Sequence, residues 1–169
     1  MRVLVTGTRA PASMDIIRSL IEQGHQVYSA DSLKFPLGRF VKDIQHHFTI
    51  PRPNNEYEAF IQALKTILIT HQIDLLIPTC EEIFFISQGY DELSKHTRLL
   101  CEPFSRLKTL HDKFAFNQLA LEYGLDVPKS WLLTTEHDKS QIPTHQDIVL
   151  KPIYSRFGTY LLLKPSQQL

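Results

Sequence analysis

The sequence has few cysteines and no excess of charge of either sign. Its 169 residues include two cysteines and 18 basic and 18 acidic side chains. Cys80 and Cys101 lack the spacing of a zinc site and are too few for a disulfide framework, so we expect a reducing compartment, the cytoplasm. Because the charges balance, no global field attracts nucleic acid or an anionic membrane, and we expect neither as a partner.

Long apolar runs and several catalytic motifs are also absent from the sequence. No apolar stretch is long enough to cross a bilayer, and the run at Val3–Val5 is too short for a signal peptide. The chain contains no phosphate-binding loop ending in Gly-Lys-Ser/Thr and no Gly-x-Ser-x-Gly elbow, and its histidines lack metal-ligand spacing. We therefore expect a soluble protein outside the common P-loop, serine-hydrolase and zinc classes.

Short apolar runs alternate with segments of helical periodicity through the first hundred residues. Runs such as Val3–Val5 and Asp74–Ile77 predict strands that are buried on both faces. Ser13, and later Asn54 or Asn55, are the predicted caps of the first two helices. Strands separated by helices imply a Rossmann-like α/β fold, with a parallel sheet and helices on both faces.

The pattern changes after Pro103. Asp112 is predicted to cap a helix that ends at Gly124, and Ile148–Leu150 reads as a short buried strand. Lys151 stands where this strand ends, which is a common place to hold a polyphosphate because the ammonium adds a point charge to backbone N–H donors. The sequence therefore predicts a second domain with an anion-binding end.

The turn after the first strand partly resembles a dinucleotide-binding motif. Counted from Gly7, the second and third glycine positions of Gly-x-Gly-x-x-Gly hold Arg9 and Ala12, and Asp31 stands where an acid would bind a ribose. An arginine at the second position obstructs the approach of pyrophosphate to the backbone. Nicotinamide or flavin binding therefore stays an alternative, and Arg9 either binds an anion at the helix N-terminus or has a structural role.

Glu81 and Glu82 follow the strand at Asp74–Ile77, at the edge where doubly wound sheets bind ligands. The carboxylate of either one could meet a substrate amine or a partner arginine, and helix capping is the alternative. Arg9 and Glu81 are our candidates for a substrate pocket in the first domain.

The order of motifs in the second half is more informative than any single one. Asp112-Lys113, an amphipathic helix, Tyr123–Pro128, a loop and then Ile148–Pro152 resemble the start of an ATP-grasp domain. The preceding residues are similar to a pre-ATP-grasp domain, as in carbamoyl-phosphate-synthase-like proteins. This resemblance implies a Rossmann-like pre-ATP-grasp domain at 1–103 and an incomplete, truncated ATP-grasp subdomain at 104–169.

The resemblance assigns phosphate contacts to two lysines. In this family the basic residue that opens the helix and the lysine that ends the strand contact the phosphates of ATP, which implies Lys113 and Lys151 here. A loop containing Ser155, Arg156 and Gly158 would cover the phosphates, although it has one glycine where the family commonly has several. The family's metal-binding Glu and Asn lie further along and have no counterpart in this chain.

Family chemistry activates a carboxylate with ATP and Mg²⁺ as an acyl phosphate, which an amine or similar nucleophile then attacks. The resemblance thus implies the N-terminal portion of a ligase acting on small-molecule carboxylates and amines. Without metal ligands, this chain alone should be inactive and bind ATP weakly or not at all. A non-catalytic module that binds a small anion or a partner is the alternative, and unpaired strand edges near Lys151 and Leu161 favour a homodimer.

Overall fold

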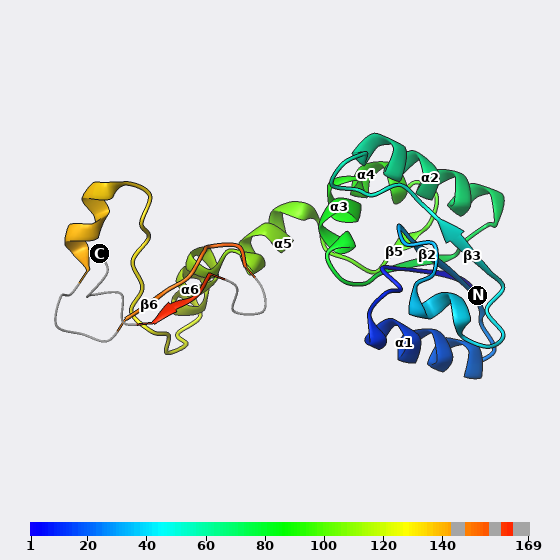
Figure 1. Cartoon of the computed structure of the whole chain (residues 1–169), viewed down its shortest axis with the longest axis horizontal. Coiled ribbons are helices and arrows are strands. Elements are labelled where there is room, and N and C mark those ends of the chain that lie inside the picture. The colour runs from blue at the N-terminus through cyan, green and yellow to red at the C-terminus, as the bar shows by residue number, and fades with distance from the viewer. Residues whose placement is uncertain (143–147, 156–159, 164–169) are drawn as a thin grey trace. The chain divides into compact units, whose positions relative to one another are not determined.

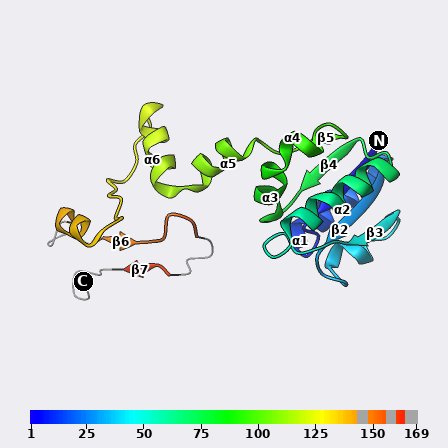
Figure 2. The same cartoon turned by 90° about the horizontal axis from the view of Figure 1, so that it is seen from above.

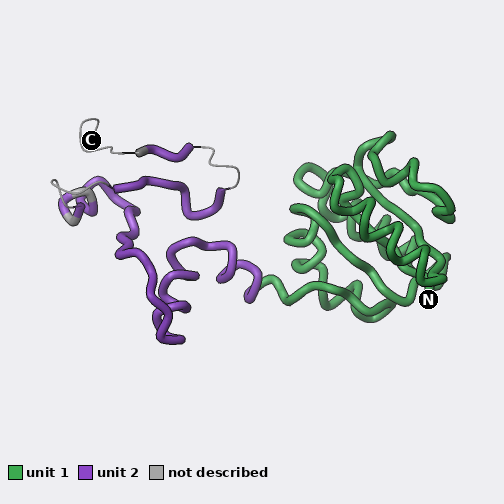
Figure 3. The backbone as a smooth tube through the Cα atoms, turned by 90° about the horizontal axis from the view of Figure 1, so that it is seen from below, with its two compact units in different colours: residues 1–104 green, residues 105–169 purple. Residues whose placement is uncertain are grey.

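The computed structural model describes residues 1–142, 148–155 and 160–163. The chain forms two compact units, Met1–Phe104 and Ser105–Leu169, which Figure 3 distinguishes by colour. Each unit has its own secondary structure. Among the described residues, no helix combines the length and the apolar composition needed to cross a bilayer.

A five-stranded parallel sheet forms the centre of the first unit. The strands follow the order β3-β2-β1-β4-β5, with each neighbouring pair parallel. This confirms the Rossmann-like α/β sheet expected from the alternating pattern. The elements are β1 (Arg2–Thr6), α1 (Pro11–Glu22), β2 (Gln26–Asp31), η1 (Leu37–Phe40), β3 (His46–Thr49), α2 (Tyr57–Thr70), β4 (Leu75–Pro78), α3 (Glu82–Gln88), α4 (Tyr90–Leu93) and β5 (Arg98–Leu99).

The two faces of the sheet pack against different helices. Alternate residues of a strand point to opposite faces, so Leu4 belongs to one apolar cluster and Val3 to the other. Leu4 packs in a cluster with Phe60 of α2, and Val3 packs in a cluster with Ile17 of α1. Figure 1 shows α1 and α2 on opposite sides of the sheet. This layering leaves the carboxyl ends of the strands for the loops that carry the polar residues.

The first helix begins two residues before the serine predicted to cap it. Ala10 is the N-cap residue and Pro11 the first helical residue, while Ser13 lies inside the first turn and its Oγ donates to the Ala10 carbonyl at 2.7 Å. Proline suits the first position because its fixed φ is helical and its missing N–H would have no partner there. The predicted cap at Ser13 is therefore wrong.

The cap predicted for the second helix is also wrong. Glu56 precedes the helix, which starts at Tyr57, and neither asparagine caps it. Asn55 and Glu56 instead donate their backbone N–H groups to the Arg52 carbonyl at 3.1 and 2.9 Å, closing a turn that contains Asn54. The asparagines thus serve the turn before the helix, a role for which the same residue types are favoured.

The described part of the second unit contains two α-helices, a 3₁₀ helix and a short hairpin. Its elements are α5 (Phe104–His111), α6 (Lys113–Glu122), η2 (Glu136–Gln141), β6 (Val149–Leu150) and β7 (Leu162–Leu163). β6 and β7 pair antiparallel, as Figure 2 shows. The cap at Asp112 is confirmed, since its Oδ1 accepts from the backbone N–H groups of Phe114 and Ala115 at 3.0 and 2.9 Å. Gly124 follows the end of α6 with φ of 71°.

Candidate functional site

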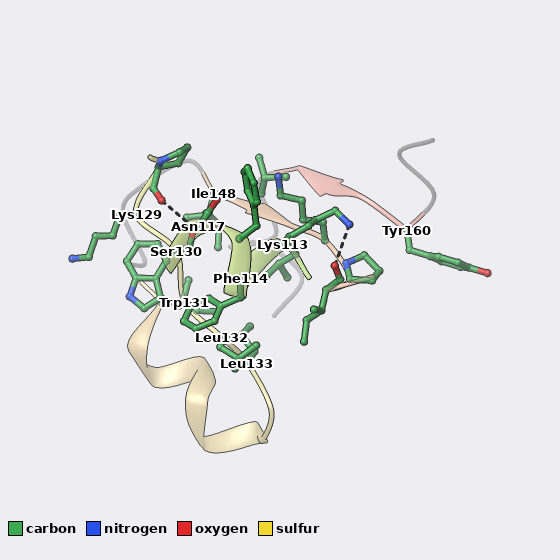
Figure 4. Close-up of a pocket in the computed structure, with 18 of the residues that line it drawn as sticks. Lys113, Phe114, Asn117, Lys129, Ser130, Trp131, Leu132, Leu133, Ile148 and Tyr160 are labelled. Carbon is green, nitrogen blue, oxygen red and sulfur yellow. Dashed lines mark hydrogen bonds between the residues drawn. The ribbon is translucent and has the colours of Figure 1, made fainter. Parts of the chain in front are cut away.

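Lys113 and Lys151 line the same cavity of the second unit. The cavity has a volume of about 1160 Å³ and is formed by α6, the segment 128–133 and β6 with the residues that follow it. Figure 4 shows the residues around it, with Lys113 and Phe114 reaching it from α6 and Trp131 from the facing segment. Three lysines, Lys113, Lys129 and Lys151, on an otherwise largely apolar wall are a suitable environment for a phosphate-bearing ligand with an apolar portion.

The ammonium group of Lys113 is held by backbone oxygens. Nζ donates to the carbonyl oxygens of Ile153 at 3.2 Å and Ser155 at 3.0 Å. The backbone N–H of Lys113 also donates to the Ile153 carbonyl, at 3.3 Å. These bonds join the start of α6 to the residues that follow Lys151, and they offset the unfavourable position of a cation at a helix N-terminus. A lysine ammonium has three N–H donors, so one remains for a ligand.

Tyr154 lies at the same junction. Its hydroxyl donates to Oδ2 of Asp112 at 3.2 Å, and its ring stacks on His111 with 5.6 Å between ring centroids. Desolvation and, after it, the hydrogen bond to Asp112 and the charge of that carboxylate raise the pKa of Tyr154, which keeps the hydroxyl protonated as a donor. Asp112 therefore both caps α6 and anchors the segment that holds Lys113.

The other predicted phosphate contacts are only partly described. Ser155 is half-buried and contributes its carbonyl to Lys113. Lys151 is exposed just after β6. Arg156 and Gly158 lie outside the described residues. Within the described part of the chain, no three His, Cys, Asp or Glu side chains lie close enough together to hold a metal ion.

Arg9 of the first unit bridges two buried carboxylates. Its backbone N–H and its Nε donate to Oδ2 of Asp31 at 3.0 and 3.2 Å, and its Nη2 donates to Oε1 of Glu82. Asp31 has no exposed area and Glu82 is 3% exposed, whereas the Arg9 side chain is 38% exposed. Arg9 thus forms ion pairs with two residues of its own unit, Asp31 and Glu82, which is a structural role. Asp31 also accepts from the backbone N–H of Leu33 at 2.8 Å, so both of its oxygens are used within the protein.

Of the two glutamates that the sequence offers as partners for an arginine, Glu82 is the one that meets Arg9. Glu81 is the residue before α3 and makes no capping bond with its side chain. Burial raises the pKa of Glu82 from 4.5 to about 7, the Arg9 guanidinium opposes this shift and Asp31 adds to it. The pair Glu81-Glu82 was visible in the sequence, but only the adjacency of β1 and β4 shows which one faces Arg9.

Gly7 meets a packing requirement in this structure. It has φ of +67°, and a Cβ built on it would lie 2.5 Å from the carbonyl oxygen of Thr79. The turns after β1 and β4 therefore pass too close for any side chain. Together with the internal bonds of Asp31, this explains the partial dinucleotide-binding pattern without a bound dinucleotide.

No protein family matches the sequence in a family comparison, and no curated protein sequence is similar to it. Three solved structures of enzymes are similar to the chain in fold. The L-amino acid ligase from Bacillus licheniformis is 15% identical, with a TM-score of 0.69, over 91% of this chain and 37% of the ligase. The N5-carboxyaminoimidazole synthetase from Staphylococcus aureus, solved with ADP, is 15% identical, with a TM-score of 0.74, over 96% of this chain and 41% of the synthetase.

The third structure is the biotin carboxylase domain of the Hydrogenobacter thermophilus 2-oxoglutarate carboxylase, in complex with MgADP, ADP and bicarbonate. It is 16% identical, with a TM-score of 0.75, over 96% of this chain and 37% of that domain. The chain therefore spans about two fifths of the length of these structures. The resemblance to the N-terminal region of ATP-grasp proteins, predicted from the sequence, is confirmed at the level of the fold.

Proposed function

We propose that this chain is the N-terminal portion of an ATP-dependent, carbamoyl-phosphate-synthase-like ligase of the ATP-grasp type. Residues 1–103 would be its pre-ATP-grasp domain and residues 104–169 the first part of its ATP-grasp domain. The observation that carries the proposal is that Lys113 and Lys151, 38 positions apart in the sequence, line one cavity. The fold of the nucleotide-bound carboxylase and synthetase supports it.

The two lysines would neutralise the phosphates of ATP. Lys113 is oriented by the Ile153 and Ser155 carbonyls, and Lys151 is exposed at the end of β6. Phosphoryl transfer depends mainly on such positioning and charge stabilisation, because little other chemistry is asked of the protein. In the complete enzyme this charge would favour transfer of the terminal phosphoryl group to a small-molecule carboxylate, and an amine would then attack the acyl phosphate.

Mg²⁺ would supply further neutralisation of phosphate charge, and the described residues form no cluster of three His, Cys, Asp or Glu side chains that could hold a metal ion. This chain alone should accordingly bind ATP weakly and release no ADP. A longer form that includes the metal ligands should release ADP when supplied with the correct amino acid or other carboxylate. In that form Lys151→Ala should abolish ADP release, and full activity of the variant would contradict the role of Lys151.

A second candidate function is a non-catalytic module that binds a small anion. The lysines that line the cavity favour it, since they can bind a phosphate without catalysing its transfer. The two candidates differ in one measurement. Release of ADP by a longer form supports the ligase, whereas binding of ATP without any turnover over a panel of amino acids supports the module.

A further inference from the structure

The junction between α6 and the segment Ile153–Ser155 contains a side chain that the proposed function does not use. Tyr154 lies between the two residues whose carbonyls hold Lys113, and its own side chain turns to Asp112 and His111. We propose that Tyr154 is a positioning residue for Lys113. This inference rests on the proposed function for its purpose, but its geometry stands on these contacts alone.

A lysine needs such support because its side chain is long and flexible. Fixing a lysine side chain costs about 2 kcal/mol of rotamer entropy, so an unsupported ammonium binds an anion less tightly than an oriented one. Lys113 is oriented only while the Ile153 and Ser155 carbonyls stay in place. These oxygens belong to backbone without regular secondary structure, which has no hydrogen-bonded ladder to fix it.

Tyr154 supplies the missing anchor from the same short segment. Its hydroxyl donates to Oδ2 of Asp112, the residue immediately before Lys113 in the chain. Oδ1 of Asp112 is itself fixed by the backbone N–H groups of Phe114 and Ala115, so the anchor is tied to the first turn of α6. The stacking of the ring on His111 adds a second contact, with the last residue of α5.

The anchor thus joins the start of α6 to the segment Ile153–Ser155. The helix provides Lys113, its N-cap residue Asp112 accepts from Tyr154, and the segment provides the two carbonyls that direct the ammonium. With two N–H donors bound to these carbonyls, the third has a fixed direction for a phosphate oxygen. Loss of the Tyr154 hydroxyl should therefore loosen Lys113 without removing any group that touches a ligand.

The test uses proton–nitrogen correlation spectra of the lysine ammonium groups in the unliganded chain. Tyr154→Phe keeps the ring on His111 and removes only the bond to Asp112, and Tyr154→Ala removes both contacts. The Lys113 ammonium protons should exchange with water about fivefold faster in Tyr154→Phe, the effect of losing one hydrogen bond, and faster still in Tyr154→Ala. Tyr123→Phe is the matched control, because Tyr123 is an exposed tyrosine of the same unit that does not line the cavity.

Unchanged Lys113 exchange in both Tyr154 variants would overturn the inference, provided that the amide spectra show α6 intact. Equal effects of Tyr154→Phe and Tyr123→Phe would overturn it as well. Titration of the wild-type chain with tripolyphosphate tests the proposed function separately. If the Lys113 signal responds to Tyr154 substitutions but not to tripolyphosphate, the positioning role stands and the phosphate site fails; if both respond, tripolyphosphate should bind Tyr154→Phe about fivefold more weakly.

Discussion

Nη2 of Arg9 donates a hydrogen bond to Oε1 of Glu82, a carboxyl group that is 3% exposed. The same guanidinium bonds to Asp31, which has no exposed area, so one cation serves two buried acids. A single positive charge compensates one carboxylate well and two only in part. The arrangement links the stability of the first unit to the protonation of Glu82.

The first prediction concerns the pH dependence of stability. Because the pKa of Glu82 is raised from 4.5 to about 7, the folded chain holds a proton between these pH values that the unfolded chain has released. The free energy of unfolding should therefore fall as pH rises through this window, by at most about 3 kcal/mol from this group. Urea unfolding of wild type and Glu82→Gln, at several pH values across the window, measures the difference.

Glu82→Gln should remove this contribution, so its stability should decline less with rising pH than that of wild type. Glu22→Gln, a change of the same kind at an exposed position of α1, should keep the wild-type slope. Parallel curves for wild type and Glu82→Gln would show that Glu82 does not hold the proton.

The second prediction separates a structural role of Arg9 from a role in binding. Arg9→Met leaves the carboxylate of Asp31 buried without its cation, which should reduce the free energy of unfolding by about 3 kcal/mol. Arg18→Met removes an exposed arginine that lies 3.6 Å from Asp15, and should cost less than about 0.5 kcal/mol. Equal, small losses in the two variants would leave Arg9 available as a ligand-binding residue.

The third prediction compares two glycines with positive φ. Gly7 has φ of +67° and no room for a Cβ next to Thr79, whereas Gly24 has φ of +79° and nothing within 4 Å. Gly24→Ala should cost about 1 kcal/mol for backbone strain alone. Gly7→Ala adds a clash with backbone and should cost clearly more, as a thermal unfolding series would show; equal losses would contradict the close contact.

The fourth prediction concerns the start of α6. Asp112→Ala removes the acceptor of two backbone N–H groups, at Phe114 and Ala115, and should destabilise the helix by about 1 kcal/mol. Amide hydrogen exchange along α6 should become faster, while Asp126→Ala, at an exposed position, should leave it unchanged. Undisturbed exchange in Asp112→Ala would mean that the cap is not needed.

The regular elements were largely predictable because their signals are local. Buried apolar runs gave the strands, and Asp112 was predictable as a cap because a short side chain with an acceptor precedes a helical pattern. The cap predicted at Ser13 is wrong because the helix begins at Pro11, and a helix that begins at proline needs no side-chain cap. The choice between Glu81 and Glu82 depends on which strands are neighbours, and this is not a local property.

The sequence indicates two lysines of the candidate site, whose binding role stays a prediction, but neither Lys129 of the same cavity nor the contacts that orient Lys113. Lys113 and Lys151 were identified from the order of motifs, and the structure places both along one cavity. The hydrogen bonds from Lys113 to the Ile153 and Ser155 carbonyls could not be predicted from the sequence. Every residue type has a backbone carbonyl, so the identity of the acceptor residue gives no signal. The role of Tyr154 could not be predicted either, because nothing in the sequence distinguishes it from any other exposed tyrosine.

The central claim is that Lys113 and Lys151 bind the phosphates of one nucleotide. Titration of a longer form, which includes the metal ligands, with ATP up to millimolar concentration, followed by the ammonium signals of the lysines, tests it most directly. Both signals should shift along a single saturation curve, Lys151→Met should weaken the response of Lys113, and Lys42 of the first unit should stay unchanged. Unmoved signals, or two curves with different dissociation constants, would contradict a shared phosphate site.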